Sequence, residues 1–138
     1  MQTELHIQPM QSSASNPILC IVGPTGAGKT HLAMSLAEYA KSIGMTIELI
    51  SMDSALVYRG MDIGTAKPSK RDRNEVVHHL IDIVEPYENF STGQFRDAST
   101  VLIDELISRG KIPLLVGGTM LYFSSLTQGL AQLPPADD

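Results

Sequence analysis

Residues 23–30 read Gly23-Pro24-Thr25-Gly26-Ala27-Gly28-Lys29-Thr30 and match the phosphate-binding loop pattern G-x-x-x-x-G-K-[ST] at every fixed position. In such a loop, backbone N–H groups surround a phosphate group, and a helix begins directly behind it. Lys29 adds a positive charge for the phosphate oxygens, and the Thr30 hydroxyl is suited to hold Mg²⁺. These residues predict a site for a phosphorylated ligand.

The segments that flank the loop are those that the motif requires. Residues 18–22 form a short apolar run of strand length. Apolar side chains then recur at helical spacing over residues 32–43, and Gly44 stands where a helix favours glycine after its last turn. The order strand, loop and helix supports the phosphate-binding interpretation.

Strands and helices alternate along the rest of the chain. Further strands are predicted over residues 46–51, 76–84 and 112–116. Ser91 and Gln94 have the spacing of a capping box, so a long helix is predicted to begin between them. This alternation predicts an α/β fold: a P-loop-type parallel sheet flanked by helices, similar to that of P-loop NTPases.

Length and composition suggest one α/β domain. The chain has 138 residues, of which 43% are hydrophobic. We expect a flexible tail over residues 1–16, the α/β domain over 17–133 and the start of a truncated linker over 134–138, so that the fold is incomplete at its C-terminus. No apolar stretch reaches membrane-spanning length, and the single cysteine, Cys20, fits a reducing compartment. We therefore expect a cytoplasmic protein without a membrane partner.

The charge pattern leaves the kind of partner open. A formal net charge of −5 disfavours a general nucleic-acid binder held mainly by charge. Residues 67–73 contain a basic cluster that consists of Lys67, Lys70, Arg71 and Arg73. It could form a local basic surface, but a solvated polar loop explains it equally well.

Residues that follow the predicted strands are the candidates for chemistry, because ligands bind beyond the carboxyl ends of parallel strands. Asp53 follows the second strand and is either a general base or metal-side carboxylate, or simply a turn residue. Gly117 and Gly118 follow the last strand, where ATP-hydrolysing enzymes of this loop class usually carry an aspartate. That omission disfavours an ATPase motor or a GTPase.

Three further titratable residues are better explained by structural roles. Asp82 interrupts an apolar run, so we expect an ion pair or hydrogen bond for its carboxylate. His78 and His79 are adjacent, so in a strand they point to opposite faces and cannot share one metal ion. The histidines and the cysteine show no spacing typical of a metal site.

Four segments carry a resemblance to a known family. They are residues 23–30, the run DSALVYRGMDIGTAKP at 53–68, HLIDI at 79–83 and PLLVGGTMLYF at 113–123. In order and spacing they resemble the tRNA dimethylallyltransferases, also called tRNA isopentenyl transferases, from about residue 17 to residue 135. The run at 53–68 is long and is hardly found outside this family.

The resemblance implies an activity and roles for particular residues. A dimethylallyl group would pass from its diphosphate to N6 of the adenosine next to the anticodon of tRNA. Thr25, Lys29 and Thr30 would bind the diphosphate and Mg²⁺. Asp53 would accept the N6 proton. The contacts with the tRNA anticodon stem-loop would come from Asp53, Ser54, Ala55, Leu56 and Thr119.

The family normally continues well beyond residue 138, with a helical insertion that grips the anticodon stem-loop and a further arginine on the diphosphate. The chain therefore resembles an N-terminal portion of an enzyme that we expect to be a monomer when intact. Three alternatives stay open: an ATP-dependent small-molecule or nucleoside kinase, an adenylate isopentenyltransferase, and a donor-binding fragment without turnover.

Overall fold

The computed structural model describes residues 6–11, 17–23, 28–60, 67–118 and 120–131. The strands in these residues are β1 (His6–Gln11), β2 (Pro17–Val22), β3 (Ile47–Ser51), β4 (His78–His79) and β5 (Ile112–Gly117). The helices are α1 (Lys29–Ser42), α2 (Lys70–Glu75), α3 (Thr92–Ser108) and α4 (Met120–Ala131). None of these helices is long and apolar enough to cross a membrane.

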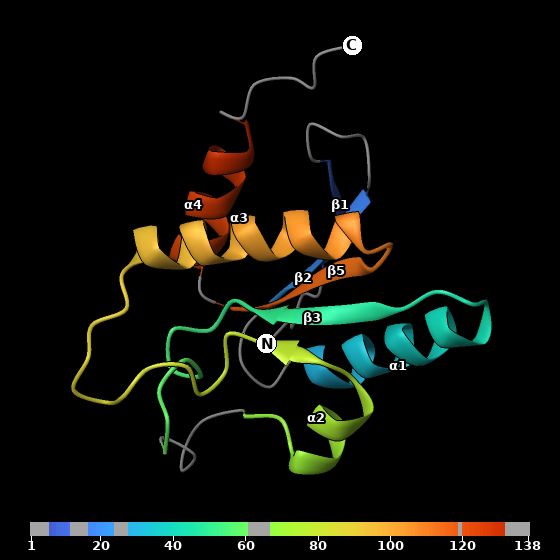
Figure 1. Ribbon diagram of the computed structural model, residues 1–138, viewed down its shortest axis with the longest axis horizontal. Coiled ribbons are helices and arrows are strands. Elements are labelled where there is room, and N and C mark those ends of the chain that lie inside the picture. Colours follow the sequence, from blue (N-terminus) through green and yellow to red (C-terminus); the bar gives the residue numbers. More distant parts are fainter. Residues whose placement is uncertain (1–5, 12–16, 24–27, 61–66, 119, 132–138) are drawn as a thin grey trace, which may run out of the picture.

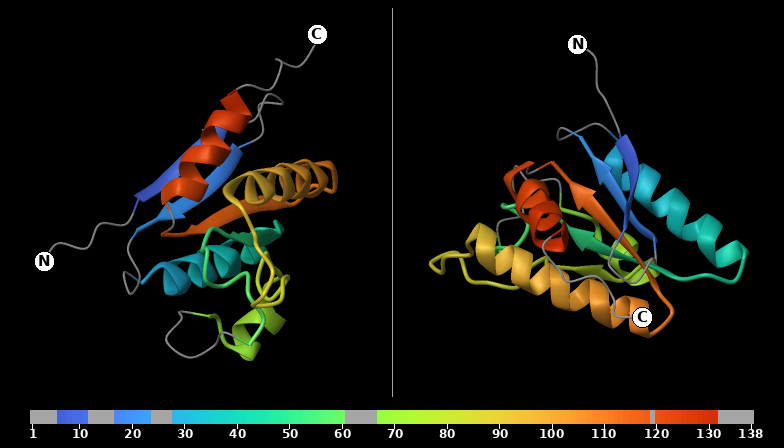
Figure 2. Two further views of the ribbon diagram at one scale, coloured as in Figure 1. Left: turned by 90° about the vertical axis from the view of Figure 1, so that its left-hand side faces the viewer. Right: turned by 90° about the horizontal axis from the view of Figure 1, so that it is seen from above.

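The strands form one sheet in the order β1-β2-β5-β3-β4 (Figure 1). Strands β2, β5, β3 and β4 run parallel to one another, as the alternation of strands and helices predicted. Helix α1 covers one face of the sheet, and α3 and α4 cover the other (Figure 2). The α/β prediction with a parallel sheet is confirmed.

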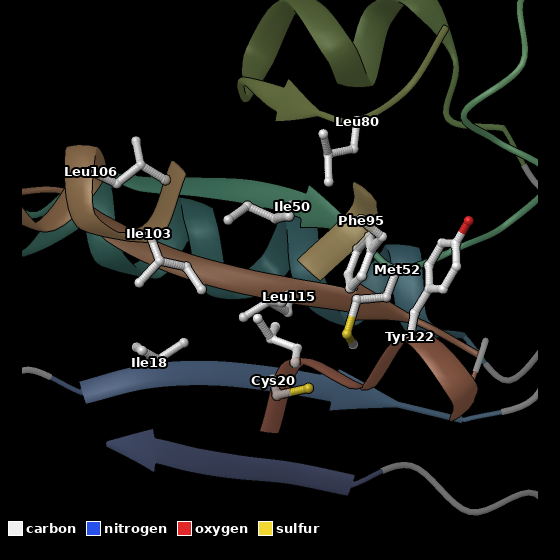
Figure 3. Close-up of a cluster of buried hydrophobic side chains, with 11 residues drawn as sticks. Ile18, Cys20, Ile50, Met52, Leu80, Phe95, Ile103, Leu106, Leu115 and Tyr122 are labelled. Carbon is white, nitrogen blue, oxygen red and sulfur yellow. The ribbon is translucent and has the colours of Figure 1, made fainter. Parts of the chain in front are cut away.

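Two apolar clusters hold the helices on the sheet. On the α3 and α4 side, Phe95 and Ile103 pack with Ile50 and Leu115 of the sheet, and Phe95 stacks on Tyr122 with ring centroids 4.2 Å apart (Figure 3). On the α1 side, three small side chains pack against the strands: Ala33, Ala37 and Ala40. Because alanine is short, α1 can approach the sheet closely.

The local signals at the helix ends are confirmed. The Ser91 hydroxyl accepts a hydrogen bond from Gln94 N, and the Gln94 side chain accepts one from Ser91 N, which completes the capping box of α3. Gly44, the glycine expected after the first helix, has a φ angle of +81°, and Gly110 after α3 has one of +73°. Glycine adopts this left-handed conformation without the steric cost that a side chain brings.

The N-terminal segment corrects one prediction. Residues 1–16 were expected to be a flexible tail, but His6–Gln11 form β1, which pairs antiparallel with β2. Backbone hydrogen bonds carry this pairing, so it needs no apolar sequence pattern and left little signal. β1 is an edge strand, where Pro9 is tolerated because its missing N–H is not needed by a second neighbour.

The structure also corrects the prediction for residues 76–84. They were expected to be one strand, but only His78 and His79 pair with β3. Leu80 and Asp82 have φ angles of +65° and +57°, which turn the chain out of the extended conformation. Residues 70–75 form the short helix α2, capped by Ser69, which the sequence pattern did not predict.

His78 and His79 point to opposite faces, as expected. The Nε2 atom of His79 lies 2.7 Å from a carboxylate oxygen of Glu48, which is only 6% exposed. Arg109 Nη2 lies 3.7 Å from the other oxygen of Glu48. The buried Glu48 carboxylate is thus balanced by groups from β4 and from the end of α3, on the side away from the site described below.

We predict that Gly117→Ala destabilises the fold. A Cβ atom at this position would lie 2.4 Å from the backbone oxygen of Met52, and backbone cannot move aside as a flexible side chain can. The free energy of unfolding should fall by about 3 kcal/mol in urea denaturation. Gly93→Ala is the matched control, because its Cβ would meet only Ser91 Oγ at 3.9 Å. Equal stabilities of the two variants would contradict the packing described here.

Candidate functional site

The carboxyl ends of β3 and β5, which are neighbours in the sheet, border a cavity of about 360 Å³ beside the start of α1. Its lining comes from the start of α1, from β3 and the segment after it, from β4, from β5 and from the 68–81 region. The lining residues are Gly28, Lys29, Thr30, His31, Leu49, Ser51, Asp53, Leu56, Pro68, His78, Ile81, Val116 and Gly117. This is the edge at which parallel sheets bind ligands.

The start of α1 supplies the positive end of the cavity. Gly28 has a φ angle of +78° and directly precedes the helix. Its position has no side-chain cap, and the first turn of α1 contains no acidic residue. The first N–H groups of a helix have no partners within it and carry a partial positive charge. With Lys29 and Thr30 at the cavity wall, this end suits an anion.

Two glycines bring β5 close to the phosphate loop. A Cβ atom on Gly118 would lie 2.6 Å from the backbone oxygen of Gly23 and 3.8 Å from Lys29 Nζ. The Gly117 backbone oxygen accepts a hydrogen bond from Gly23 N at 3.3 Å. Glycines therefore stand at 117 and 118 because backbone segments pass there at close range. This close approach explains why glycines follow β5, where ATP-hydrolysing enzymes with this loop usually carry an aspartate.

Asp53 lies across the cavity from the loop. One of its carboxylate oxygens accepts a hydrogen bond from Ala55 N at 2.8 Å, so the side chain also has the turn role that the sequence left open. Partial burial lowers the pKa of Lys29, and the nearby negative charge of Asp53 opposes that change without cancelling it. The two charges thus face the same cavity.

The remaining predicted site residues differ in their placement. Leu56 is buried and lines the cavity, whereas Ser54 is exposed. Ala55 is half-buried next to them. Four loop residues, Pro24, Thr25, Gly26 and Ala27, lie outside the described residues, as does Thr119.

Part of the cavity lining is apolar, and sequence reasoning missed it. Leu49, Leu56, Ile81 and Val116 contribute hydrocarbon side chains from three different segments. Part of this lining could have been predicted from the sequence. Leu49 and Ser51 are two residues apart in a strand, so their side chains share one face of the sheet. Ile81 could not be placed, because the turn at Leu80 and Asp82 was not predicted.

Asp82 holds the 67–73 segment against the cavity. Lys67 Nζ lies 2.5 Å from one of its carboxylate oxygens, and Arg73 Nη1 lies 2.8 Å from the other. The expected ion pair is confirmed, although the backbone there is not a strand. We call these two ion pairs of Asp82, with Lys67 and Arg73, the Asp82 clasp. Pro68 directly follows Lys67 and lines the cavity, so the clasp holds part of the cavity lining in place.

The Asp82 clasp predicts a pH dependence. Partial burial acts to raise the pKa of Asp82, but the hydrogen bonds and charges of Lys67 and Arg73 prevail and lower it. Its stabilising contribution should be present above the pKa of the unfolded chain, ~3.9, and be lost as pH falls through the lower folded value. We expect Asp82→Asn to destabilise the protein by about 1–3 kcal/mol at pH 7.

The measurement is urea denaturation of wild type and Asp82→Asn between pH 7 and pH 2. The difference between the two should shrink as pH falls below about 4, because the carboxylate is protonated first in the unfolded chain and only at its lower pKa in the folded chain. Asp104→Asn, which changes an exposed carboxylate of α3, should show no such difference. A difference that stayed constant down to the lowest pH would argue against the clasp.

Within the described parts of the chain, no group of three or more histidine, cysteine, aspartate or glutamate residues could hold a metal ion. A metal held mainly by protein side chains is therefore not indicated there. Mg²⁺ commonly takes one or two protein ligands together with substrate phosphates and water. The Thr30 hydroxyl at the cavity fits that mode.

Comparison with known proteins agrees with this geometry. Residues 56–138 match the sequence profile of the family described as IPP transferase. The chain belongs to the IPP transferase family. A tRNA dimethylallyltransferase of Polynucleobacter asymbioticus is 64% identical over 137 residues, which are 99% of this chain and 41% of that protein. One from Ralstonia pickettii is 55% identical over 127 residues, with 91% and 38% covered.

Solved structures of family members show the same fold. The full-length tRNA isopentenylpyrophosphate transferase of Bacillus halodurans is 45% identical, with a TM-score of 0.73 over 86% of this chain and 38% of that one. A eukaryotic dimethylallyltransferase described as acting on tRNA is 34% identical, with a TM-score of 0.70 over 78% and 25%. The chain thus spans about two fifths of the length of the curated relatives it matches.

Proposed function

We propose that this chain forms the prenyl-donor site of a tRNA dimethylallyltransferase. The enzyme transfers a dimethylallyl group from dimethylallyl diphosphate to N6 of the adenosine on the 3′ side of the anticodon, and it releases diphosphate. One observation carries the proposal: the lining of one cavity combines Lys29 and the start of α1 with the hydrocarbon side chains of Leu49, Leu56, Ile81 and Val116. The related tRNA dimethylallyltransferases support it.

The two kinds of lining residue match the two parts of an allylic diphosphate. Lys29 and the start of α1 suit the diphosphate, and Leu49, Ile81 and Val116 suit the five-carbon chain. A nucleotide would need partners for a polar base and sugar, whereas the apolar lining offers carbon atoms. The cavity therefore favours the prenyl donor over ATP, the ligand of the kinase alternative.

The reaction needs a stabilised leaving group and a base. The bond between C1 of the prenyl chain and the diphosphate oxygen breaks, and its electron pair leaves with the diphosphate. Lys29 stabilises that charge. The N6 lone pair forms the new bond to C1, and Asp53 accepts the N6 proton. Asp53 and Lys29 face the same cavity, so one bound donor can lie between them.

Mg²⁺ is part of the proposal. Thr30 would contribute its hydroxyl as a ligand, and diphosphate oxygens and water would complete the coordination. When bound, the ion supplies additional positive charge for the leaving diphosphate. Thr25 belongs to the same proposed diphosphate and metal site.

The tRNA contacts are proposed at the mouth of the cavity. Exposed Ser54, together with Ala55 and Leu56, continues the chain from the proposed base and would line the adenine, and Thr119 would contact the tRNA. The adenine has to leave the anticodon stack to reach Asp53. Because the proposed substrate is tRNA, we propose that the enzyme is cytoplasmic and that it acts as a monomer.

Transfer can be tested with an extended protein, in which residues 1–138 are followed by the remaining carboxyl-terminal part of the Polynucleobacter asymbioticus relative. Labelled dimethylallyl diphosphate should modify an anticodon stem-loop that carries adenosine on the 3′ side of the anticodon. The same RNA with guanosine at that position is the control. Modification of both RNAs, or of neither, would contradict the proposed function. Donor binding without transfer by residues 1–138 alone would identify them as a donor-binding module.

A further inference from the structure

The helices connect the parallel strands in a consistent order across the sheet. Helix α1 leads from β2 to β3 and packs on one face of the sheet, whereas α3 leads from β4 to β5 and packs on the other (Figure 2). The chain therefore moves toward the β4 edge over the α1 face, and back toward the β1 edge over the α3 face. Crossovers between parallel strands are right-handed in nearly all proteins, and a single handedness gives the two faces opposite directions.

Helix α4 determines where a parallel strand that follows it belongs. It follows β5 and lies on the α3 face, because Tyr122 and Leu126 belong to the same apolar cluster as Phe95. On this face the chain moves from β5 toward the β1 edge. β2 already occupies the place beside β5, so a parallel strand after α4 belongs at the far edge of β2. In this structure β1 occupies that edge.

β1 differs from the other strands of the described sheet. It pairs antiparallel with β2, whereas the remaining pairs are parallel. Only residues 12–16 separate it from β2 along the chain, whereas a helix separates each parallel strand from the next. Its contacts with other helices and strands are mainly those with β2. Because pairing between two strands is marginally stable by itself in water, another strand that makes the same backbone hydrogen bonds can replace β1.

We infer that the far edge of β2 is the docking edge for a carboxyl-terminal part like that of the relatives, and that a parallel strand of this part displaces β1. The relatives possess such a part, because the matched residues are only 41% of the Polynucleobacter asymbioticus protein. Until that strand pairs with β2, β1 satisfies the backbone groups of an edge that would otherwise be open to wrong partners. The exchange depends on the topology of the sheet and not on the ligand of the cavity.

Pro9 favours displacement of β1 over addition of a strand outside it. Proline has no N–H group, so in a sheet it is confined to positions where a neighbouring strand does not need one. Pro9 pairs with Leu19 of β2, and the other side of β1 is the open edge of the sheet. A strand outside β1 would meet this missing donor. Residues 18–22 of β2, in contrast, all carry an N–H group.

Hydrogen exchange of the backbone amides tests the displacement. In residues 1–138 alone, amides of residues 6–11 should be protected by pairing with β2, and in the extended protein they should lose that protection. Amides of residues 18–22 should stay protected in both, because β2 keeps β5 as a partner and exchanges β1 for the new strand. The Polynucleobacter asymbioticus relative, compared with its own 137 matched residues, provides the same measurement without a junction.

Deletion of residues 1–11 is the second measurement. It should lower the melting temperature of residues 1–138 by roughly 5 °C or more, because β2 loses its partner on that side. The melting temperature of the extended protein should change by less than about 2 °C, because the new strand holds the edge. Deletion of residues 1–5, which leaves His6–Gln11 in place, is the control and should change neither protein.

A disulfide that holds β1 in place should oppose the exchange. Gln8 pairs with Cys20 of β2, so Gln8→Cys sets two cysteines at paired positions, whose Cα separation in antiparallel strands suits a disulfide. Because burial raises the pKa of Cys20 to about 12, the bond is formed by refolding in a glutathione buffer. At equilibrium, the link should resist reduction at least about tenfold better in residues 1–138 than in the extended protein. Ile7→Cys, which pairs with Ile21, is the control and should form no link.

The possible outcomes separate the exchange from the proposed function. Equal protection of residues 6–11 in both proteins, or a link that is equally resistant in both, would show that β1 keeps its place and would overturn the exchange. Free exchange of residues 6–11 in residues 1–138, or a deletion without effect on either protein, would overturn the role of β1 at this edge. Failure to bind dimethylallyl diphosphate would contradict the proposed function and leave these results unaffected.

Discussion

Asp53→Asn is expected to reduce prenyl transfer by the extended protein by about 10²- to 10⁴-fold, the usual contribution of a general base. Asparagine keeps an oxygen that can accept the hydrogen bond from Ala55 N, which lies 2.8 Å from Asp53 Oδ1. The turn after β3 should therefore survive, and only the capacity to take the N6 proton is lost. Asp53→Ala removes both functions, so comparing the two variants separates catalysis from local structure.

Donor binding is the second readout for this variant. The dissociation constant of dimethylallyl diphosphate should stay within about threefold of wild type, because Asp53 contacts the acceptor in this account and not the diphosphate. Asp97→Asn on α3, whose carboxylate is 76% exposed, is the matched control and should keep full transfer. Transfer that survives Asp53→Asn would remove Asp53 from the role of base.

Lys29→Met is expected to weaken binding of dimethylallyl diphosphate by about 10- to 100-fold. Methionine preserves much of the side-chain volume but removes the ammonium group, and hydrogen bonds to charged groups contribute ~1.5–3 kcal/mol. Lys41→Met removes one positive charge from the exposed part of the same helix and controls for net charge. Calorimetry with Mg²⁺ measures both. Equal affinities of the two variants would show that Lys29 does not bind the diphosphate.

Lys29→Met should also change how the free energy of unfolding depends on pH in the absence of donor. Burial lowers the pKa of Lys29 in the folded chain, so the unfolded chain binds more protons than the folded chain at alkaline pH. The stability of wild type should therefore rise with pH between the lowered pKa and ~10.5, and that rise should be smaller in Lys29→Met.

Local sequence signals predicted much of the fold. The capping box at Ser91, the glycines after α1 and α3, and the apolar strand β5 each depend on interactions within a few residues. The flanks of the phosphate loop were predicted for the same reason. Gly117 and Gly118 were recognised as a motif, but their contacts with Met52 and Gly23 depend on the folded sheet.

The elements that the sequence did not predict depend on distant partners. β1 is held by backbone pairing with β2, which leaves little trace in side-chain pattern. The apolar run at residues 76–84 has the composition of a strand, yet Asp82 N bonds to Leu56 O and Ile83 N bonds to Val57 O instead of extending β4. The clasp from Lys67 and Arg73 then holds the turn.

The candidate site divides along the same line. Lys29, Thr30 and Asp53 were predicted because they sit in motifs or follow strands. The apolar residues of the cavity lining come from separate segments, and only the folded sheet brings them to one cavity. In the proposed function, this apolar lining is also what favours a prenyl donor over a nucleotide.

The most direct measurement of that distinction is calorimetry of residues 1–138 with Mg²⁺ and either dimethylallyl diphosphate or ATP. Both ligands offer phosphates to Lys29, so the difference between them reports on the apolar lining. We expect dimethylallyl diphosphate to bind more tightly than ATP, and Val116→Ser, which adds a hydroxyl to the apolar lining, to reduce this preference. Tighter binding of ATP than of dimethylallyl diphosphate would contradict it.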